Sequence, residues 1–417
     1  MDNPTPQKAG VIKTHPIAGY ESALKMTLGA ISPLKGGKEM DLGDCLHRVL
    51  SADIHSMVNS PSVDASMKDG YAVVSDEIRD ATPENPVQLK LTGMMAAGGD
   101  ARLRVEPGTT VRILTGAGIP AGATAVLAGE FARCDREWVT VFNHAEPGRN
   151  ILKAGMDICA GEQVAQKGTI LNPGLIGTIA AAGFGRVPVY HRPRVAILAT
   201  GDELVVPGDP LPDGKVYASN LEMLKAWCRQ FGMSTSFQLL QDTPKIISHA
   251  METAAATHDV LITSGGAWTG DRDFIAQTLA SLGWKKVFHA IRMGPGKAVG
   301  FGMLQDKPVF ILPGGPPSNL TAFLQIALPG LLKLAGHRRP GLPEIRVRLQ
   351  TSLDGSHVDW TEFVYGSLVP GDTHTGFQPL ELTRRLRSMA FAQAAVAIPE
   401  GISCLPEGSI VTAQVFP

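Results

Sequence analysis

Residues 195–204, with the sequence VAILATGDEL, decide the fold class, because an uninterrupted apolar strand runs there into a loop of glycine and acidic residues. Two later segments repeat this arrangement, VLITSGGAWTGDRD at 260–273 and VFILPGGPPS at 309–318. A fourth strand is predicted at 234–240. Helices are predicted between and after the strands, at 220–230, 244–257, 274–282 and 317–334. Strands that alternate with helices are typical of a parallel sheet, so we expect an α/β domain over 191–338.

The rest of the chain shows other patterns. Apolar spacing within 17–50 predicts two helices separated by the break at Gly36-Gly37, and a further helix is predicted at 174–183. Short runs of β-type composition, punctuated by Gly and Pro, are predicted to form strands at 71–74, 87–91, 110–114, 125–127 and 138–141. Alternating strands are predicted near the C-terminus at 345–349, 363–368, 394–398 and 409–415.

We therefore predict a multidomain fold of the α/β plus β class. A discontinuous N-terminal domain of helices and strands contains an inserted β domain, the α/β domain follows, and a β domain ends the chain. The predicted boundaries are 1–55 with 148–190 for the N-terminal domain, 56–147 for the inserted domain, 191–338 for the α/β domain and 342–417 for the last one.

Composition excludes several classes of protein. Of the 417 residues, 44% are hydrophobic and 18% are charged, which excludes a disordered chain, a coiled coil and a collagen-like repeat. The net charge of −1 argues against binding nucleic acid or a membrane through a global field. The five cysteines form no CxxC pair, and the N-terminal residues lack the profile of a signal peptide. We expect a cytoplasmic protein without a membrane span.

The loops that follow the α/β strands carry the candidate chemistry. In an open parallel sheet, ligands bind beyond the carboxyl ends of the strands. Glycine lets backbone N–H groups approach a phosphate, and hydroxyls add donors. The glycine and hydroxyl candidates are Thr200, Gly201, Ser264, Gly265, Gly266, Gly314 and Ser318, and Pro313 is a further candidate binding residue of the third loop. Carboxylates beside them, at Asp202, Glu203, Asp271 and Asp273, predict a bridging divalent cation such as Mg²⁺. The alternative is that the loops are tight turns and the acids are helix N-caps.

Two basic features remain open at this point. Lys297 follows the turn-forming Pro295 and Gly296, and it is either a solvated turn residue or a fixed cation for an anionic ligand. The surrounding segment lacks the upstream glycine and the following hydroxyl of a Walker motif. The basic run TRRLR at 383–387 is either a solvated β edge or an anion-binding patch.

Several motifs in a fixed order carry a family resemblance. They are ASMKDGYAV at 65–73, LTGAGIP at 114–120, GRNI at 148–151 with GMDI at 155–158, TGDEL at 200–204, SGG at 264–266, GDRDF at 270–274, PGK at 295–297 and LPG at 312–314. Together they resemble the molybdopterin molybdenumtransferases, a family that includes the E domain of gephyrin. The match covers most of the chain.

This resemblance implies an elongated homodimer of four-domain subunits. Each subunit would contain a molybdopterin-binding three-layer α/β/α domain, two mainly β domains and a helical/β N-terminal domain. Members of the family take adenylylated molybdopterin and molybdate, use magnesium, insert the metal and release AMP. The ligand cleft would lie between the α/β domain and the β domain of the partner subunit.

The resemblance also implies roles for individual residues. Glu203 and Asp273 match acids near the pyrophosphate and magnesium, and Asp242 matches another cleft acid. Lys297 matches a lysine near the molybdate site, where Gly296 shapes the turn. Three further matches would line the cleft from the partner subunit or close to it, namely Asp69, Thr115 and Asp157.

The chain departs from the family pattern around the oxyanion. Gly294 stands where the family usually has a lysine, Ala298 replaces a proline, Gly315 replaces an asparagine and Tyr365 aligns with an arginine. Loss of two cations predicts molybdate binding weakened about a hundred-fold, unless arginines of the 384–387 run replace them. Three functions therefore stay open: an active molybdenumtransferase with a remodelled pocket, a paralogue that binds a pterin or nucleotide ligand or inserts another oxyanion such as tungstate, and a non-catalytic dimeric scaffold.

Overall fold

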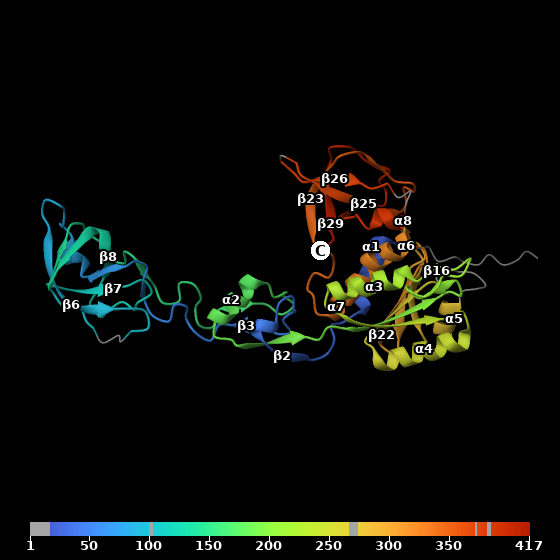
Figure 1. Cartoon of the computed structure of the whole chain (residues 1–417), viewed down its shortest axis with the longest axis horizontal. Coiled ribbons are helices and arrows are strands. Elements are labelled where there is room, and N and C mark those ends of the chain that lie inside the picture. Colours follow the sequence, from blue (N-terminus) through green and yellow to red (C-terminus); the bar gives the residue numbers. More distant parts are fainter. Residues whose placement is uncertain (1–16, 100–102, 267–273, 372, 382–384) are drawn as a thin grey trace, which may run out of the picture. The chain divides into compact units, whose positions relative to one another are not determined.

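The computed structural model describes residues 17–99, 103–266, 274–371, 373–381 and 385–417. The chain divides into two compact units, shown in Figure 1 and described separately here. The larger unit contains Met1–Gly36 and Tyr190–Pro417, and the smaller unit contains Gly37–Val189. Among the described helices, none is long and apolar enough to cross a membrane.

A central sheet organises the larger unit, with the strand order β17-β14-β18-β22-β21-β19. Its strands are β14 (Arg194–Thr200), β17 (Ser234–Leu240), β18 (Val260–Ser264), β19 (Lys285–His289), β21 (Gly300–Leu304) and β22 (Lys307–Leu312). β17, β14, β18 and β22 run parallel, and β21 and β19 add an antiparallel edge. The strand predictions for this domain are confirmed. β14, β18 and β22 arise from short apolar runs that the sheet buries on both faces, whereas β17 lies at the edge of the sheet and is largely exposed.

Helices cover both faces of this sheet. Successive side chains of β14 alternate between two apolar clusters, with Val195 and Ile197 in one and Ala196 and Leu198 in the other. Helices on the first face are α1 (Tyr20–Ala30), α3 (Ser219–Gln230), α6 (Pro316–Ala322), the π-helical turn η4 (Phe323–Ala327) and α7 (Leu328–Leu334). Helices on the second face are α4 (Pro244–Thr257) and α5 (Phe274–Ser281). The predicted three-layer α/β/α arrangement is confirmed.

The C-terminal strands of the larger unit form a closed ring. Their bounds are β23 (Glu344–Leu349), β25 (Thr361–Val369), β26 (Gly376–Pro379), β27 (Ala394–Ile398) and β29 (Ile410–Val415). β25 pairs with both β26 and β27, so the pairing order β25-β26-β23-β29-β27 returns to β25. β20 (Ile291–Gly294) joins this barrel by pairing with β25, Met293 opposite Thr361. The turn that carries Lys297 therefore begins at the barrel wall.

The smaller unit contains a β domain, as predicted. Its sheet has the order β8-β5-β7-β6-β10-β9. The strands are β5 (Gly70–Val73), β6 (Val87–Met95), β7 (Thr109–Ile113), β8 (Ala125–Ala128), β9 (Ala132–Asp135) and β10 (Trp138–Val141). Alternate residues of β5 and β8 enter two separate apolar clusters, so both faces of the sheet are covered.

One helix prediction is wrong. The helix predicted after Gly36-Gly37 is replaced by strand β2 (Gly37–Asp41), which pairs with β13 (Arg186–Tyr190), and by a 3₁₀ turn, η1 (Leu42–Asp44). The backbone N–H of Leu50 donates to the carbonyl of Thr169, and the Leu50 side chain is fully buried. Apolar residues with helical spacing are held here by contacts with the distant helix α2 (Pro173–Ala181), which sequence spacing does not reveal.

Phe310 provides a direct test of this core. It is fully buried on β22, its ring lies 5.0 Å from that of Phe301, and α7 packs closely on it at Gly330. Phe310→Ala should lower the free energy of unfolding of the α/β domain by about 3–5 kcal/mol. Phe391→Ala, at a site that is 66% exposed, is the control and should change it by less than about 0.5 kcal/mol. Equal effects in urea unfolding followed by circular dichroism would contradict the assigned core.

Candidate active site

Three loops leave the α/β sheet from one edge. β14, β18 and β22 end at Thr200, Ser264 and Leu312. The register places Ala199 opposite Ser264, and Ser264 opposite Leu312, so the strands end at the same level. The N–H of Gly265 donates to the carbonyl of Leu312 over 3.1 Å. Groups carried by the three loops therefore face one ligand space beyond the strands.

Glycine is required in the second loop because the backbones approach closely. Gly265 has φ +97°, and a Cβ on it would lie 2.4 Å from the carbonyl oxygen of Thr200. Gly266 has φ +64°, and its Cβ would lie 2.7 Å from the side chain of Ile275. No other residue fits these contacts without moving the backbone or a buried side chain. The glycines noted in the sequence thus bring the loop against the end of β14.

Two asparagines missed in the sequence hold the third loop. Asn319, fully buried on α6, donates through Nδ2 to Ser264 Oγ at 3.0 Å and to the Pro313 carbonyl at 2.8 Å. Asn220, on α3, donates to the Gly314 carbonyl at 2.7 Å. For Asn319, the signal in the sequence is an amide on a helix without charged residues that directly follows a glycine loop. These bonds fix the spacing between the loops.

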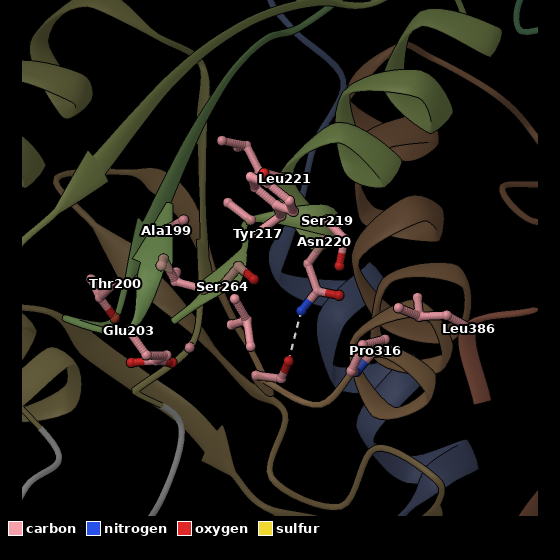
Figure 2. Close-up of a pocket in the computed structure, with 15 residues that line it drawn as sticks. Ala199, Thr200, Glu203, Tyr217, Ser219, Asn220, Leu221, Ser264, Pro316 and Leu386 are labelled. Atoms are coloured by element: carbon pink, nitrogen blue, oxygen red, sulfur yellow. Dashed lines mark hydrogen bonds between the residues drawn. The ribbon is translucent and has the colours of Figure 1, made fainter. Parts of the chain in front are cut away.

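The loops border a cavity of about 500 Å³, which we call the Glu203 pocket. Figure 2 shows Thr200 and Glu203 at one end and Pro316 and Leu386 at the other. Predicted site residues in its lining are Thr200, Glu203, Ser264, Gly265 and Gly314, and apolar or hydroxyl side chains supply most of the remainder, including Leu204, Tyr217, Ser219 and Leu221. Such a cavity suits an organic ligand with a few polar groups.

Two buried polar atoms on the wall of the Glu203 pocket are ready to bind a ligand. Within the described part of the chain, Thr200 Oγ1 and Asn220 Oδ1 have no hydrogen-bond partner. Buried polar atoms are normally paired, because leaving one unpaired costs about 1–3 kcal/mol. A ligand that donates to Asn220 Oδ1 and bonds Thr200 Oγ1 would remove this cost.

Acidic side chains gather beside the first loop. The pKa of Asp242 is raised by burial and by the charges of Asp202 and Glu203, although its own N–H donates to Asp202 Oδ1 at 3.3 Å. The Glu203 carboxylate folds over Gly201, where a Cβ would lie 2.6 Å from Oε2. Mutual repulsion among these carboxylates falls when a cation binds. The sequence-based interpretation of a cation near Glu203 fits this arrangement.

The described residues do not by themselves complete a metal site. No group of three His, Cys, Asp or Glu side chains among them is arranged to hold a metal ion. Asp273, the predicted partner of Glu203, lies outside the described residues, as does Asp271. Magnesium commonly takes one or two carboxylates and completes its shell with water and substrate phosphates. A pair of carboxylates is therefore a sufficient protein donor set.

A second cavity, the Lys297 pocket, has a volume of about 490 Å³. The predicted site residues in its lining are Gly296, Lys297, Pro313, Gly314 and Ser318, and Gly315 and Trp360 are further lining residues. Gly314 borders both pockets. The predicted residues thus separate into an acidic pocket and a basic one on either side of one glycine turn.

Lys297 is held by an aromatic side chain that the sequence did not indicate. Its Nζ lies 5.2 Å from the centre of the Trp360 ring, within the range of a cation–π interaction. His357 stacks on Trp360 at 4.9 Å and bonds Glu362. Trp360 comes from the barrel segment next to β25, so only the three-dimensional pairing of β20 with β25 brings it to Lys297.

Tyr365 does not substitute for the arginine of the family pattern. It is fully buried on β25, and its hydroxyl and Thr321 Oγ1 share a hydrogen bond of 2.6 Å. Burial raises the pKa of this hydroxyl, so it stays neutral. The Tyr365 side chain packs between the barrel and α6, and it supplies no charge to a ligand.

In the smaller unit, two of the predicted residues lie together. Asp69 Oδ1 accepts hydrogen bonds of 2.7 Å from both the N–H and the hydroxyl of Thr115, and these bonds lower the pKa of the carboxyl. Asp157 lies in a separate loop, where its N–H donates to the carbonyl of Ser60. Asp69 is therefore held as an exposed carboxylate.

The fold and its two pockets define a ligand-binding α/β domain joined to β domains, and family matches identify the ligand class. Residues 18–183 match the family described as MoeA N-terminal region (domain I and II). Residues 196–333 match the family described as probable molybdopterin binding domain. The class of protein is thus a multidomain molybdopterin-binding protein.

Similarity to individual proteins identifies the family within this class. The molybdopterin molybdenumtransferase of Nostoc sp. is 32% identical over 91% of this chain and 88% of its own length, and that of Bacillus subtilis is 34% identical over 68% and 67%. The solved structure of the molybdopterin biosynthesis moeA protein from Pyrococcus horikoshii OT3 matches with a TM-score of 0.83 and 27% identity, over 96% of this chain and 100% of that one. The chain belongs to the molybdopterin molybdenumtransferase family, and it is a transferase of molybdenum cofactor biosynthesis.

The importance of the close approach between Gly265 and the Thr200 carbonyl can be tested by substitution. Gly265→Ala introduces a methyl group 2.4 Å from the Thr200 carbonyl and should reduce molybdenum cofactor synthesis by about a hundred-fold, because a displacement of about 1 Å at the loop spoils the site. Gly283→Ala is the matched control, since Gly283 also has a positive φ, +83°, but nothing lies within 4 Å of its Cβ position. Reconstitution assays in which both variants lose activity equally would contradict the role of the contact.

Proposed function

We propose that this chain inserts molybdenum from molybdate into adenylylated molybdopterin, in a reaction that requires Mg²⁺ and releases AMP. The observation that carries this proposal is the pair of cavities of opposite charge that share Gly314. A substrate with a diphosphate and a nearby dithiolene needs a cation-binding acidic region and an oxyanion-binding basic region in contact with each other.

The Glu203 pocket would hold the organic substrate. Its apolar lining suits a ring system, and Thr200 Oγ1 and Asn220 Oδ1 offer unpaired polar atoms. The backbone N–H of Gly201 would approach the phosphates, because this residue carries no side chain that would block them. These groups orient the phosphoanhydride bond relative to the acids.

Glu203 and Asp273 would hold magnesium, with Asp242 close by. Burial, together with the charges of Asp202 and Glu203, raises the pKa of Asp242, and the charge part of this effect supports a cation at this position. When bound, the ion neutralises charge that develops on the phosphate oxygens. Asp202 and Asp242 contribute further negative charge that favours a cation over a second anion.

The Lys297 pocket would hold molybdate. Lys297 provides a positive charge held over Trp360, and Ser318 provides a hydroxyl donor in the same lining. Gly296, with φ +114°, lets the chain turn so that Lys297 faces this cavity. Oxyanions are bound in proteins by such fixed cations together with neutral donors.

We further propose that two copies of the chain form the working enzyme. The family resemblance implies that Asp69, Thr115 and Asp157 of the smaller unit complete the cleft of a second copy. The hydrogen bonds that hold Asp69 exposed as a carboxylate support a role for it in binding. The four-domain boundaries predicted from the sequence belong to this proposal, and so does a cytoplasmic location, which the free cysteines support.

Reconstitution with defined substrates tests this function. Purified protein is incubated with adenylyl-molybdopterin, Mg²⁺ and either molybdate or tungstate, and both AMP and the metal-loaded pterin are measured. The proposal requires AMP release and transfer of molybdenum. AMP release with tungstate transfer alone would instead identify an enzyme for another oxyanion, an outcome favoured by the missing cations at Gly294 and Tyr365. Absence of both products would contradict the proposed reaction.

Two acid substitutions test the magnesium site. Glu203→Gln and Asp273→Asn should each reduce the rate of AMP release by about ten-fold or more, because each removes a charged ligand at similar volume. Extra Mg²⁺ should partly restore both variants. Asp213→Asn, in the exposed loop that follows, is the control and should keep the normal rate. A normal Mg²⁺ requirement in either acid variant would remove that residue from the site.

A substitution of Lys297 tests the role of the Lys297 pocket independently of the Glu203 pocket. Lys297→Ala should raise the molybdate concentration for half-saturation by about ten- to a hundred-fold, because a charge-assisted hydrogen bond contributes about 1.5–3 kcal/mol. Binding of the adenylylated substrate, measured by calorimetry, should change little. Lys286→Ala, an exposed lysine on β19, is the control. An unchanged half-saturation concentration in Lys297→Ala would show that Lys297 does not contact the oxyanion.

A further inference from the structure

We propose that Arg385 supplies a second positive charge to the Lys297 pocket and that Gly315 is the residue that lets it reach this position. Arg385 would thereby determine affinity for the oxyanion in place of the cations that the family pattern has and this chain lacks. The inference rests on the proposed function of the Lys297 pocket as the molybdate site.

The contact between Arg385 and Gly315 is the starting observation. Arg385 begins α8 (Arg385–Met389), which packs against α6. Its Nη2 lies 3.1 Å from the position that a Cβ on Gly315 would occupy, and Gly315 lines the Lys297 pocket. The next residue, Leu386, lines the Glu203 pocket. The start of α8 therefore lies at the turn that separates the two cavities.

Backbone conformation does not explain the glycine at 315. Its φ is −69° and its ψ is 127°, values that any L-residue adopts. A side chain at this position would instead meet the Arg385 guanidinium, which is the one group within 4 Å of its Cβ position among the described residues. The family pattern has asparagine here, so the change to glycine makes room for the guanidinium. Gly315 and Arg385 thus form a complementary pair.

The charges on this side of the fold are not used elsewhere. Neither Arg385 nor Lys297 forms an ion pair within the described part of the chain. Glu362 lies beside the Lys297 turn, and its Cγ would be 3.4 Å from a Cβ on Gly294. Its carboxylate already accepts bonds from the N–H groups of Ser356 and His357. Two cations without acidic partners at one cavity favour an anionic ligand.

Arg385 also differs from its neighbour in the same basic run. Both Arg385 and Arg387 are exposed on α8, but only the guanidinium of Arg385 lies within 4 Å of the Cβ position on Gly315. Of the two arginines of the run that the structure describes, Arg385 is therefore the one placed beside the Lys297 pocket, and Arg384 lies outside the described residues. Arg387 is the matched control for charge and for helix.

Kinetics with varied molybdate test the proposal. Arg385→Ala should raise the molybdate concentration for half-saturation by about ten-fold or more, with a smaller change in the rate at saturation. Arg385→Lys should recover part of this loss, because it keeps the charge without the planar fork. Arg387→Ala should stay within about two-fold of the unmodified protein. A half-saturation concentration in Arg385→Ala within two-fold of normal would overturn the proposal.

Gly315→Asn tests the same idea without removing the charge. It should reproduce the effect of Arg385→Ala, and the double variant should be no worse than either single one, because both changes remove one interaction. Additive effects would overturn the pairing of these two residues. Circular dichroism melting of each variant identifies loss of fold. Failure of the unmodified protein to transfer any metal would contradict the proposed function itself, whereas normal transfer by Arg385→Ala contradicts only the role of Arg385.

Discussion

The contact between the Thr200 carbonyl and Gly265 is the constraint on which the site depends. It joins the ends of two neighbouring parallel strands so tightly that no side chain fits between them. The Gly265 N–H then donates to the carbonyl of Leu312 at the end of the third strand. Asn319 donates both to Ser264 at the end of the second strand and to Pro313 in the turn after the third. Three loops that are far apart in the sequence become one rigid edge, and the chemistry of the protein is arranged along that edge.

Acidic and basic side chains lie on opposite sides of Gly314 along this edge. On one side, Glu203 and Asp242 crowd negative charge beside an apolar cavity. On the other side, Lys297 brings positive charge to a cavity lined by glycine and tryptophan, and the guanidinium of Arg385 lies beside Gly315 in the same lining. A turn without side chains allows a single ligand to contact both, because nothing on it fills the boundary. In the proposed function, this separation would let one domain hold a diphosphate with its cation and an oxyanion without either displacing the other.

How well the sequence predicts an element depends on how far away in the sequence the residues that it contacts lie. Strands such as β14 are predictable because an apolar run buried on both faces needs no distant partner to be identified. The strand at Gly37–Asp41 is not predictable in this way, because its partner strand β13 lies far away in the sequence. The same limit applies within the site. The glycine and acidic loops are visible in the sequence, whereas Trp360 reaches the Lys297 pocket and Arg385 reaches Gly315 only through packing of the barrel and of α8.

The most direct measurement is the location of molybdate in crystals of the full chain, found by anomalous scattering at the molybdenum edge. The account predicts the strongest peak in the cavity lined by Lys297, Gly315 and Trp360, on the opposite side of Gly314 from Glu203. A strongest peak beside Glu203, or the absence of any peak near Lys297 at saturating molybdate, would contradict the division of the site into an acidic and a basic half.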